Sequence, residues 1–349
     1  MTSPTKNNNT RAVWFKGETV FMIDQIRLPF EKHTVELKDY TATVKAIKEM
    51  LTRGAGSIGA AAGFAVAQAA LQTSGDYESY IRKAKAEIES ARPTAKDLFT
   101  ATERVFRAAL QSPQKAVEEA QAFADEIVEA AYSIGVYGNE ILPEKASVLT
   151  HCNAGRLAIV DHGSATAPIY EAHRKGKAIH VYVDETRPRS QGARLTAYEL
   201  HEAGVPHTVI PDNAAAWLMA SGKIDLLITG ADRIVANGDT ANKIGTLEKA
   251  IAAKYYGIPF YVAAPFSTFD FDTPSGKEIT IEERKHDEVL RQTGPDSEGN
   301  IRSIQVVSPG SPVFNPAFDI SPAELITGFI TPRGIFKVSE MQKIKHYVK

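Results

Sequence analysis

Short apolar segments alternate with helical stretches along the second half of the chain, and this alternation constrains the fold most strongly. Beyond about residue 135, runs rich in β-branched and aliphatic residues are separated by segments with helical spacing. These runs cover residues 146–151, 178–185, 206–210, 224–230 and 259–264. Apolar strands that alternate with helices are typical of a parallel sheet covered on both faces. The pattern therefore predicts an α/β fold with a Rossmann-like C-terminal domain built on a parallel sheet.

The residues before this predicted sheet follow a different pattern. Residues 12–30 contain two short strand-like runs that we expect to form a hairpin, with Gly17 in its turn. From about residue 41 to residue 131, apolar residues recur at helical spacing. A chain of 349 residues is long enough for roughly two domains. We predict a smaller strand-plus-helix domain at residues 1–130 and a Rossmann-like catalytic domain at residues 131–349.

Composition and charge exclude several classes of partner and location. The formal net charge is −2, so no general field attracts nucleic acid or an anionic membrane. The single cysteine excludes an intrachain disulfide and fits a reducing compartment, and the polar N-terminus lacks the apolar core of a signal peptide. The longest apolar run, residues 55–71, is interrupted by Gly, Ser and Gln and is shorter than the roughly 20 residues of a membrane span. We therefore expect a cytoplasmic protein that binds neither nucleic acid nor membrane.

Polar or turn-forming clusters follow each of the five predicted strands. In chain order they read HCNAG, ETRPRSQG, PDNA, GADR and AAPFST. Open α/β sheets bind their ligands at the carboxyl ends of the strands. The five clusters therefore predict one crevice, before any residue is given a role.

The segment RGAGSIG at residues 53–59 matches the dinucleotide fingerprint G-x-G-x-x-G. That fingerprint requires a preceding strand, but the residues on both sides have helical patterns, so we expect no nicotinamide cofactor. One interpretation is that small residues opening a helix present backbone N–H groups to an anion, with the charge of Arg53 beside them. The other is that the glycines only allow close packing of helices. The sequence leaves both open.

Cys152 and Asp232 are the candidates for acid–base chemistry, because each directly follows a predicted strand. A lone cysteine is more often a small buried residue, but at a strand end a thiol with a tuned pKa could act as acid or base. The apolar strand before Asp232 suggests a partly desolvated carboxyl group with a raised pKa. The alternative for Asp232 is a structural carboxylate paired with Arg233 or Lys243.

Further polar residues follow the same strands. Lys243 offers a positive charge and Asn242 a directional hydrogen bond, while Gln191 and Arg187 extend from the neighbouring strand end. None of the nine histidines forms an H-E-x-x-H motif or a close-spaced ligand pair, so no metal site is expected. The charge-rich stretch at residues 282–300 is predicted to be a solvated helix and loop.

Taken together, the motifs resemble the methylthioribose-1-phosphate isomerases. The matching segments, in chain order, are RGAGSIG, ARPTAKDLF, LTHCNAG, ETRPRSQGARLTAYEL, GADRIVANGDTANKIGT and NPAFDISP. They extend from about residue 12 to residue 335. This family is related to the ribose-1,5-bisphosphate isomerases and to the regulatory subunits of translation initiation factor two-B. The resemblance implies an N-terminal domain with a helical portion joined to a Rossmann-like domain, as a homodimer.

The resemblance also implies a reaction and a set of roles. The family isomerises S-methyl-5-thioribose 1-phosphate to S-methyl-5-thioribulose 1-phosphate in methionine salvage, with neither metal nor nicotinamide. Asp232 would assist ring opening and closure, and Cys152 would serve transfer between C2 and C1, as a proton through an enediol or as a shielded hydride. The positions matching those that hold the phosphate and sugar hydroxyls are Arg53, Gly54, Ala55, Arg92, Gln191, Asn242 and Lys243.

The sequence departs from the family pattern at two places. Gly56 and Ser57 replace the Pro-Ala pair of the usual RGAPAIG, and residues 156–164 replace a run of small residues. Arg156, Asp161 and His162 in that segment could line the pocket and change the accepted C5 substituent, or could lie outside it. The alternative substrates are 5-deoxyribose 1-phosphate and ribose 1,5-bisphosphate. The alternative classes are a non-catalytic translation-factor subunit and a nicotinamide oxidoreductase.

Overall fold

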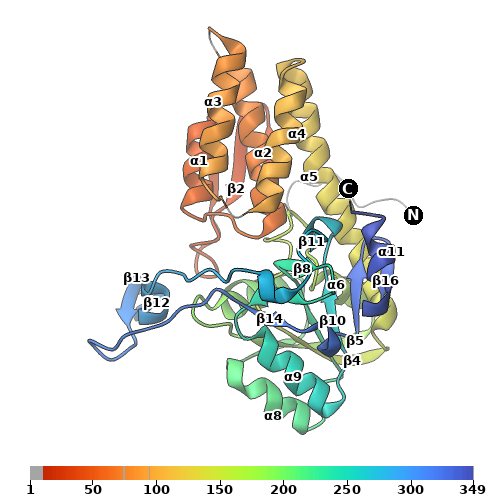
Figure 1. Ribbon diagram of the computed structural model, residues 1–349. Helices are drawn as coiled ribbons and strands as arrows, with labels where there is room; N and C mark the ends of the chain where they lie inside the picture. The colour runs from red at the N-terminus through yellow and green to blue at the C-terminus, as the bar shows by residue number, and fades with distance from the viewer. Residues whose placement is uncertain (1–10, 74, 94, 349) are drawn as a thin grey trace. The chain divides into compact units, whose positions relative to one another are not determined.

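The computed structural model describes residues 11–348 except residues 74 and 94 (Figure 1). The chain divides into two compact units. The N-terminal unit contains the described residues up to Ser133 together with Ala154–Ala167, and the C-terminal unit contains Ile134–Asn153 and the described residues from Pro168 onward. The chain thus returns to the N-terminal unit for one short segment, which no pattern in the sequence indicated.

The N-terminal unit combines a three-stranded antiparallel sheet, in the order β1-β2-β3, with a group of helices. Its strands are β1 (Val13–Lys16), β2 (Thr19–Ile23) and β3 (Thr34–Leu37). Its helices are α1 (Tyr40–Lys48), α2 (Ala55–Gln72), α3 (Tyr77–Ser90), α4 (Lys96–Ala109) and the first part of α5 (Pro113–Gly138). Gly17 has φ 65° in the β1–β2 turn, so the predicted hairpin and its turn residue are confirmed.

Local sequence signals explain where several helices begin. Asp39 and Asp76 precede α1 and α3, and their carboxylates accept the N–H groups of Ala42 and Ser79. Helix α5 begins with Pro113, whose missing N–H is no loss in a first turn. Helix α2 is buried from Gly56 to Ala70, so the alanine-rich run is an interior helix. In the described part of the chain, no helix has both the length and the apolar character needed to cross a bilayer.

The C-terminal unit is built on a seven-stranded sheet in the order β16-β15-β10-β7-β4-β5-β6. Every neighbouring pair is parallel except β15 and β16 at one edge. The strands are β4 (Lys145–Thr150), β5 (Ala178–Asp184), β6 (His207–Ile210), β7 (Leu226–Thr229), β10 (Phe260–Ala263), β15 (Gly328–Thr331) and β16 (Gly334–Phe336). The first five coincide with the five predicted runs. The chain is therefore a mixed α/β protein with a parallel-rich central sheet.

Helices and short turns connect these strands. The helices are α6 (Ala167–Arg174), α7 (Ala197–Glu202), α8 (Ala215–Ala220), α9 (Thr246–Tyr256), α10 (Asp287–Leu290) and α11 (Met341–Lys345), and a π-helix, Gly192–Thr196, precedes α7. The 3₁₀ turns are Asn139–Ile141, Asp212–Ala214, Phe266–Thr268, Gly276–Glu278, Ala323–Leu325 and Val338–Glu340. Helix α9 ends at Gly257, which has φ 71° and so terminates the helix in the left-handed conformation.

A second sheet and a separate hairpin complete the C-terminal unit. The second sheet has the order β11-β8-β9-β14, with β8 (Arg233–Val235), β9 (Thr240–Lys243), β11 (Phe269–Asp270) and β14 (Phe318–Ser321). The hairpin pairs β12 (Arg291–Pro295) with β13 (Ile301–Gln305) and projects from the unit (Figure 1).

The prediction of a helix and loop over residues 282–300 was partly wrong, because the helix α10 covers only four residues and a strand follows it. The Asp296 carboxylate accepts the N–H groups of Glu298 and Asn300, which closes a turn and pairs the two strands.

Aromatic side chains fill the core of the C-terminal unit. Phe260, Phe269 and Phe329 are fully buried, and the rings of Phe269 and Phe329 meet edge to face with centroids 5.7 Å apart. Phe260 and Phe329 lie on the adjacent strands β10 and β15, so their packing holds the central sheet together.

We expect Phe329→Ala to lower the free energy of unfolding by about 3–5 kcal/mol, because it leaves a cavity in this core. Chemical denaturation followed by circular dichroism measures the change. Tyr255→Ala is the matched control, since Tyr255 is 81% exposed, and its effect should stay within about 0.5 kcal/mol. Equal denaturation midpoints for the Phe329→Ala and Tyr255→Ala variants would contradict this account of the core.

Candidate active site

The carboxyl ends of the parallel strands bring the predicted polar clusters to one edge of the central sheet. Cys152 follows β4, Gln191 follows β5 and Asp232 follows β7, and β4 pairs with both β5 and β7. The clusters after neighbouring parallel strands therefore share one edge. The N–H of Asp232 donates to Ala241 O at 2.9 Å, which attaches this edge to β9. Asn242 and Lys243 are the last two residues of β9.

Two threonines hold the backbone of Cys152. Its φ is 67°, in the left-handed region that a non-glycine residue adopts only at a cost of about 1–2 kcal/mol. Its N–H donates to Thr186 Oγ1 at 2.9 Å, and its carbonyl accepts from Thr196 Oγ1 at 2.6 Å. Thr186 Oγ1 donates in turn to Asp184 O at 3.1 Å. The half-buried thiol is therefore carried by a backbone that residues of the next strand end fix in place.

The segment after β5 is itself fixed by Asp212. Its two carboxylate oxygens each accept a backbone N–H at 2.7 Å, one from Thr186 and one from Arg187. The guanidinium of Arg187 donates to Pro188 O and Val289 O, so it is occupied within the protein. Further along the same segment, position 192 requires glycine, because a Cβ there would lie 1.7 Å from Asp184 O.

Gln191 is a candidate for contact with a ligand. It is 7% exposed, and its Oε1 atom has no hydrogen-bond partner within the described residues. A buried amide oxygen without a donor costs free energy, so a ligand hydroxyl that donates to it would be favoured. The substrate-binding role that the family resemblance implies for Gln191 stays a prediction.

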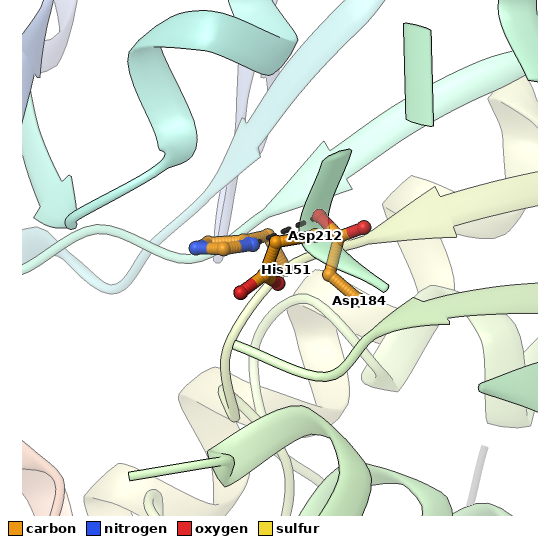
Figure 2. A group of neighbouring side chains, drawn as sticks. All are labelled: His151, Asp184 and Asp212. Carbon is orange, nitrogen blue, oxygen red and sulfur yellow. Dashed lines mark hydrogen bonds and ion pairs between the residues drawn. The ribbon is translucent and has the colours of Figure 1, made fainter. Parts of the chain in front are cut away.

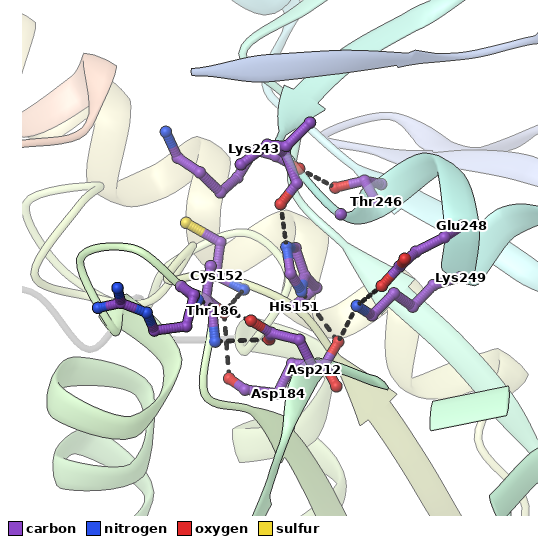
Figure 3. A network of polar contacts seen from close by, with 12 residues as sticks. His151, Cys152, Asp184, Thr186, Asp212, Lys243, Thr246, Glu248 and Lys249 are labelled. Carbon is purple, nitrogen blue, oxygen red and sulfur yellow. Dashed lines mark hydrogen bonds and ion pairs between the residues drawn. The ribbon is translucent and has the colours of Figure 1, made fainter. Parts of the chain in front are cut away.

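Behind Cys152 lies a buried network of charged groups, centred on His151 and Asp184 (Figures 2 and 3). His151 and Asp184 are 1% and 0% exposed, and His151 Nδ1 lies 2.9 Å from Asp184 Oδ2. Lys249 Nζ lies 3.5 Å from the same oxygen and also contacts Glu248. Burial raises the pKa of Asp184, while His151 and Lys249 act in the opposite direction. Burial lowers the pKa of Lys249, but Asp184 and Glu248 outweigh it and raise that pKa.

His151, Asp184 and Asp212 have ligand-type atoms that lie within 4.8 Å of one another, which raises the question of a metal ion. The arrangement does not fit one. The Lys249 ammonium already faces the Asp184 oxygen, and both Asp212 oxygens accept backbone N–H groups. A cation placed here would meet an ammonium and displace existing hydrogen bonds. The expectation of no metal stays a prediction.

The predicted partial burial of Asp232 was wrong, because its side chain is exposed. Asp232 lies between β7 and β8. The two structural partners that the sequence suggested for it each have another contact. Arg233 forms an ion pair with Asp270 at 3.5 Å, and Lys243 Nζ donates to Ala317 O at 2.9 Å.

Asn242 and Lys243 are both buried, at 5% and 8% exposed. The ammonium of Lys243 lies 4.6 Å from the centroid of the Phe318 ring, which is a cation–π contact. Asn242 Nδ2 donates to Thr246 Oγ1 at 3.0 Å. The nearby first turn of α9 is already capped, since the Asp319 carboxylate accepts the N–H groups of Gly245 and Leu247.

The remaining predicted site residues, Arg53, Gly54, Ala55 and Arg92, lie on the N-terminal unit. Gly54 has φ 86°, and a Cβ there would lie 2.4 Å from Ala158, so this position requires glycine. Ala55 is the exposed first residue of α2, where an N–H has no partner within the helix. The N–H of Ser57 in the same turn already donates to Ala158 O at 3.1 Å, so the interpretation of this turn as an anion site stays a prediction.

The two departures from the family pattern contact each other in the N-terminal unit. The buried hydroxyl of Ser57 donates to Leu157 O at 2.9 Å and accepts from Val160 N at 2.8 Å. A Cβ on Gly56 would lie 3.3 Å from the Cα of Ile159, so the small residue allows a close approach. Arg156, Asp161 and His162 belong to the segment that this contact holds. Sequence reasoning missed Ser57 as the anchor, although both departures were visible.

We expect Ser57→Ala to lower the free energy of unfolding by about 1–3 kcal/mol, because the buried Val160 N–H loses its acceptor. Thermal and urea denaturation measure the loss. Ser90→Ala is the control, since Ser90 is an exposed serine that donates only to Glu87 O, and it should change stability by about 0.5 kcal/mol or less. A Ser57 variant as stable as the parent would show that the hydroxyl does not anchor the segment.

Comparisons with known proteins agree with this architecture. The initiation factor 2 subunit family matches residues 51–338. A methylthioribose-1-phosphate isomerase from Methylorubrum extorquens is 48% identical over 337 residues, covering 93% of this chain and 92% of that protein.

Two solved structures are similar to this chain. The 5-methylthioribose 1-phosphate isomerase from Pyrococcus horikoshii OT3 has a TM-score of 0.88 and 40% identity, covering 97% of this chain and 96% of that one. The translation initiation factor eIF-2B, subunit delta, from A. fulgidus has a TM-score of 0.85 and 37% identity, covering 96% of this chain and 100% of that one. On this similarity over nearly its whole length, the chain belongs to the initiation factor 2 subunit family and, within it, groups with the methylthioribose-1-phosphate isomerases.

Proposed function

We propose that the chain is an aldose–ketose isomerase that converts S-methyl-5-thioribose 1-phosphate into S-methyl-5-thioribulose 1-phosphate, with Cys152 and Asp232 as its catalytic pair. The observation that carries the proposal is the placement of this pair after the adjacent parallel strands β4 and β7. This placement of Cys152 and Asp232 occurs in a chain that is 48% identical to a methylthioribose-1-phosphate isomerase. The reaction is an intramolecular oxidation and reduction, and its place in methionine salvage follows from the substrate.

The phosphate on the anomeric carbon sets the chemical problem. Because that oxygen is esterified, the ring cannot open as a free hemiacetal does. We assign to Asp232 the acid–base work of ring opening and closure, for which its exposed carboxylate is accessible. Cys152 serves the transfer of hydrogen from C2 to C1, either as a proton through an enediol or as a shielded hydride. Substrate and product have the same atoms, so neither route consumes an external oxidant or reductant.

The binding residues divide between anion and hydroxyl recognition. Arg53, Arg92 and the N-terminal turn of α2, at Gly54 and Ala55, suit a phosphate group. The buried Lys243 adds a positive charge, and Gln191 and Asn242 offer amide groups to the sugar hydroxyls. The partner is then a small sugar phosphate, and we expect no nicotinamide or metal cofactor.

We expect Cys152→Ser and Asp232→Asn each to lower turnover by about 10²–10⁴-fold, because each removes a proton-transfer group from the reacting carbons. Phosphorus-31 and proton NMR of enzyme with S-methyl-5-thioribose 1-phosphate measure the growth of the ketose signal. Circular dichroism checks that both variants are folded.

Two results would count against the catalytic pair. One is turnover near the parent rate in both folded variants. The other is unhindered alkylation of the enzyme by iodoacetamide in the presence of saturating substrate. Cys152 is the only cysteine of the chain, so alkylation reports on this thiol alone. A bound substrate at the proposed site should protect it.

The second candidate substrate is 5-deoxyribose 1-phosphate, followed by ribose 1,5-bisphosphate. Parallel NMR assays with the three sugars rank them by rate, since the C5 substituent is their only difference. The other candidate class is a non-catalytic subunit, which the 37% identity to an eIF-2B delta subunit favours. Absence of turnover on all three sugars, with co-purification of initiation factor two, would support that class.

We also propose the cellular and assembly features implied by the family resemblance. The C-terminal domain, residues 131–349, is Rossmann-like, residues 1–130 form the N-terminal domain, and the protein works in the cytoplasm as a homodimer. Large apolar side chains that are exposed in the single chain suit such an interface. On the segment around the β13 strand they are Ile301, Ile304, Val306 and Phe314.

We expect multi-angle light scattering to give twice the mass of the single chain. Ile304→Lys should shift the assembly toward the monomer, because it places a charge where an apolar contact is expected. Lys277→Glu is a matched surface control outside this segment. A monomeric mass for the parent protein would reject the homodimer.

A further inference from the structure

His151 connects two segments that carry the proposed site residues. Its Nδ1 atom lies 2.9 Å from Asp184 Oδ2 at the end of β5, and its Nε2 atom lies 2.9 Å from Ile244 O, between β9 and α9 (Figure 3). The ring also packs against Gly245, where a Cβ would lie 3.0 Å from its Cε1 atom. One buried imidazole thus joins the central sheet to the turn between β9 and α9. This turn, Ile244 and Gly245 directly after Lys243, is called the Lys243 corner below.

The contact of Nε2 determines where the ring carries one proton. A carbonyl oxygen only accepts, so Nε2 must donate to Ile244 O and carries a proton. Nδ1 and Asp184 Oδ2 share the proton that lies between them. Burial raises the pKa of Asp184, while Lys249 Nζ, 3.5 Å from the same oxygen, acts in the opposite direction.

Other ionisable groups lie near the ring. Asp184 lies on β5, Asp212 follows β6, and Asp319 lies on β14. Helix α9 contributes Lys249 and the largely exposed Glu248. Burial raises the pKa of both Asp184 and Asp319.

We propose that His151 is a positioning residue that fixes Cys152 relative to the Lys243 corner, through its contacts with Asp184 and Ile244 O. His151 directly precedes Cys152, and Ile244 directly follows Lys243. Loss of the Nε2 contact would free the Lys243 corner from the strand end that carries the thiol. The proposal rests on the roles assigned above to Cys152 and Lys243.

A pair of substitutions separates the two contacts. The amide nitrogen of glutamine can take the place of Nε2, whereas that of asparagine can take the place of Nδ1. His151→Gln therefore keeps a donor for Ile244 O, and His151→Asn loses it. His201→Gln, at an exposed histidine of α7, is the control.

We expect His151→Asn to raise KM for S-methyl-5-thioribose 1-phosphate by about tenfold or more, because the half-buried Ile244 carbonyl loses its hydrogen bond and the segment after Lys243 loses its tie to the strand end of Cys152. In His151→Gln, KM should stay within about threefold of the parent value, since the donor is retained. A KM equal to that of the parent in the Asn variant, or equal impairment of the two variants, would overturn the positioning role.

The protonation state has its own test, which does not depend on turnover. Long-range proton–nitrogen NMR of protein labelled with ¹⁵N-histidine, compared with His151→Gln, identifies the two ring nitrogens of His151. Nε2 should resonate as a protonated nitrogen, since it donates to Ile244 O. An unprotonated Nε2 would overturn this contact and with it the positioning role. If the parent protein turned over no sugar phosphate, the proposed function would fail, and this spectrum would still decide the state of the ring.

Discussion

The pairing of β4 with β5 on one side and β7 on the other is the constraint on which the site depends. Parallel pairing makes the three strands end at the same edge, so residues far apart in the chain meet without a long loop. The threonine contacts to Cys152 follow from it, because Thr186 and Thr196 both lie in the segment that leaves β5. The same pairing places the buried side chains of His151 and Asp184 next to each other.

The sequence predicts the features that local patterns encode. Buried strands of a parallel sheet are continuous apolar runs, so all five predicted runs appear as strands, and Gly17 marks its hairpin turn. The candidate residues at strand ends could be found in the same way. The exposure of Asp232 could not be predicted in this way, because it depends on how the turn after β7 packs against the rest of the folded chain. The hairpin of β12 and β13 was missed because its charged residues hide the strand pattern.

The contacts that support the site join residues too distant in sequence for any local pattern. His151 and Asp184 are 33 positions apart, and Ser57 and Leu157 are 100 apart. His151 was visible as part of a strand-end cluster, yet one of nine histidines offers no sign of what its two nitrogens contact. A buried ring between a carboxylate and a carbonyl is a property of the folded chain alone.

The contact of Ser57 with the segment at Leu157–Val160 makes two separate stretches of sequence a single inherited unit. A proline at position 56 would bring ring atoms to a place where a Cβ already approaches Ile159, and an alanine at 57 would leave Val160 without its acceptor. Residues 156–164 therefore cannot be exchanged with those of a Pro-Ala relative unless positions 56 and 57 are exchanged with them. Chimeras within this family, natural or designed, have to respect that joint boundary.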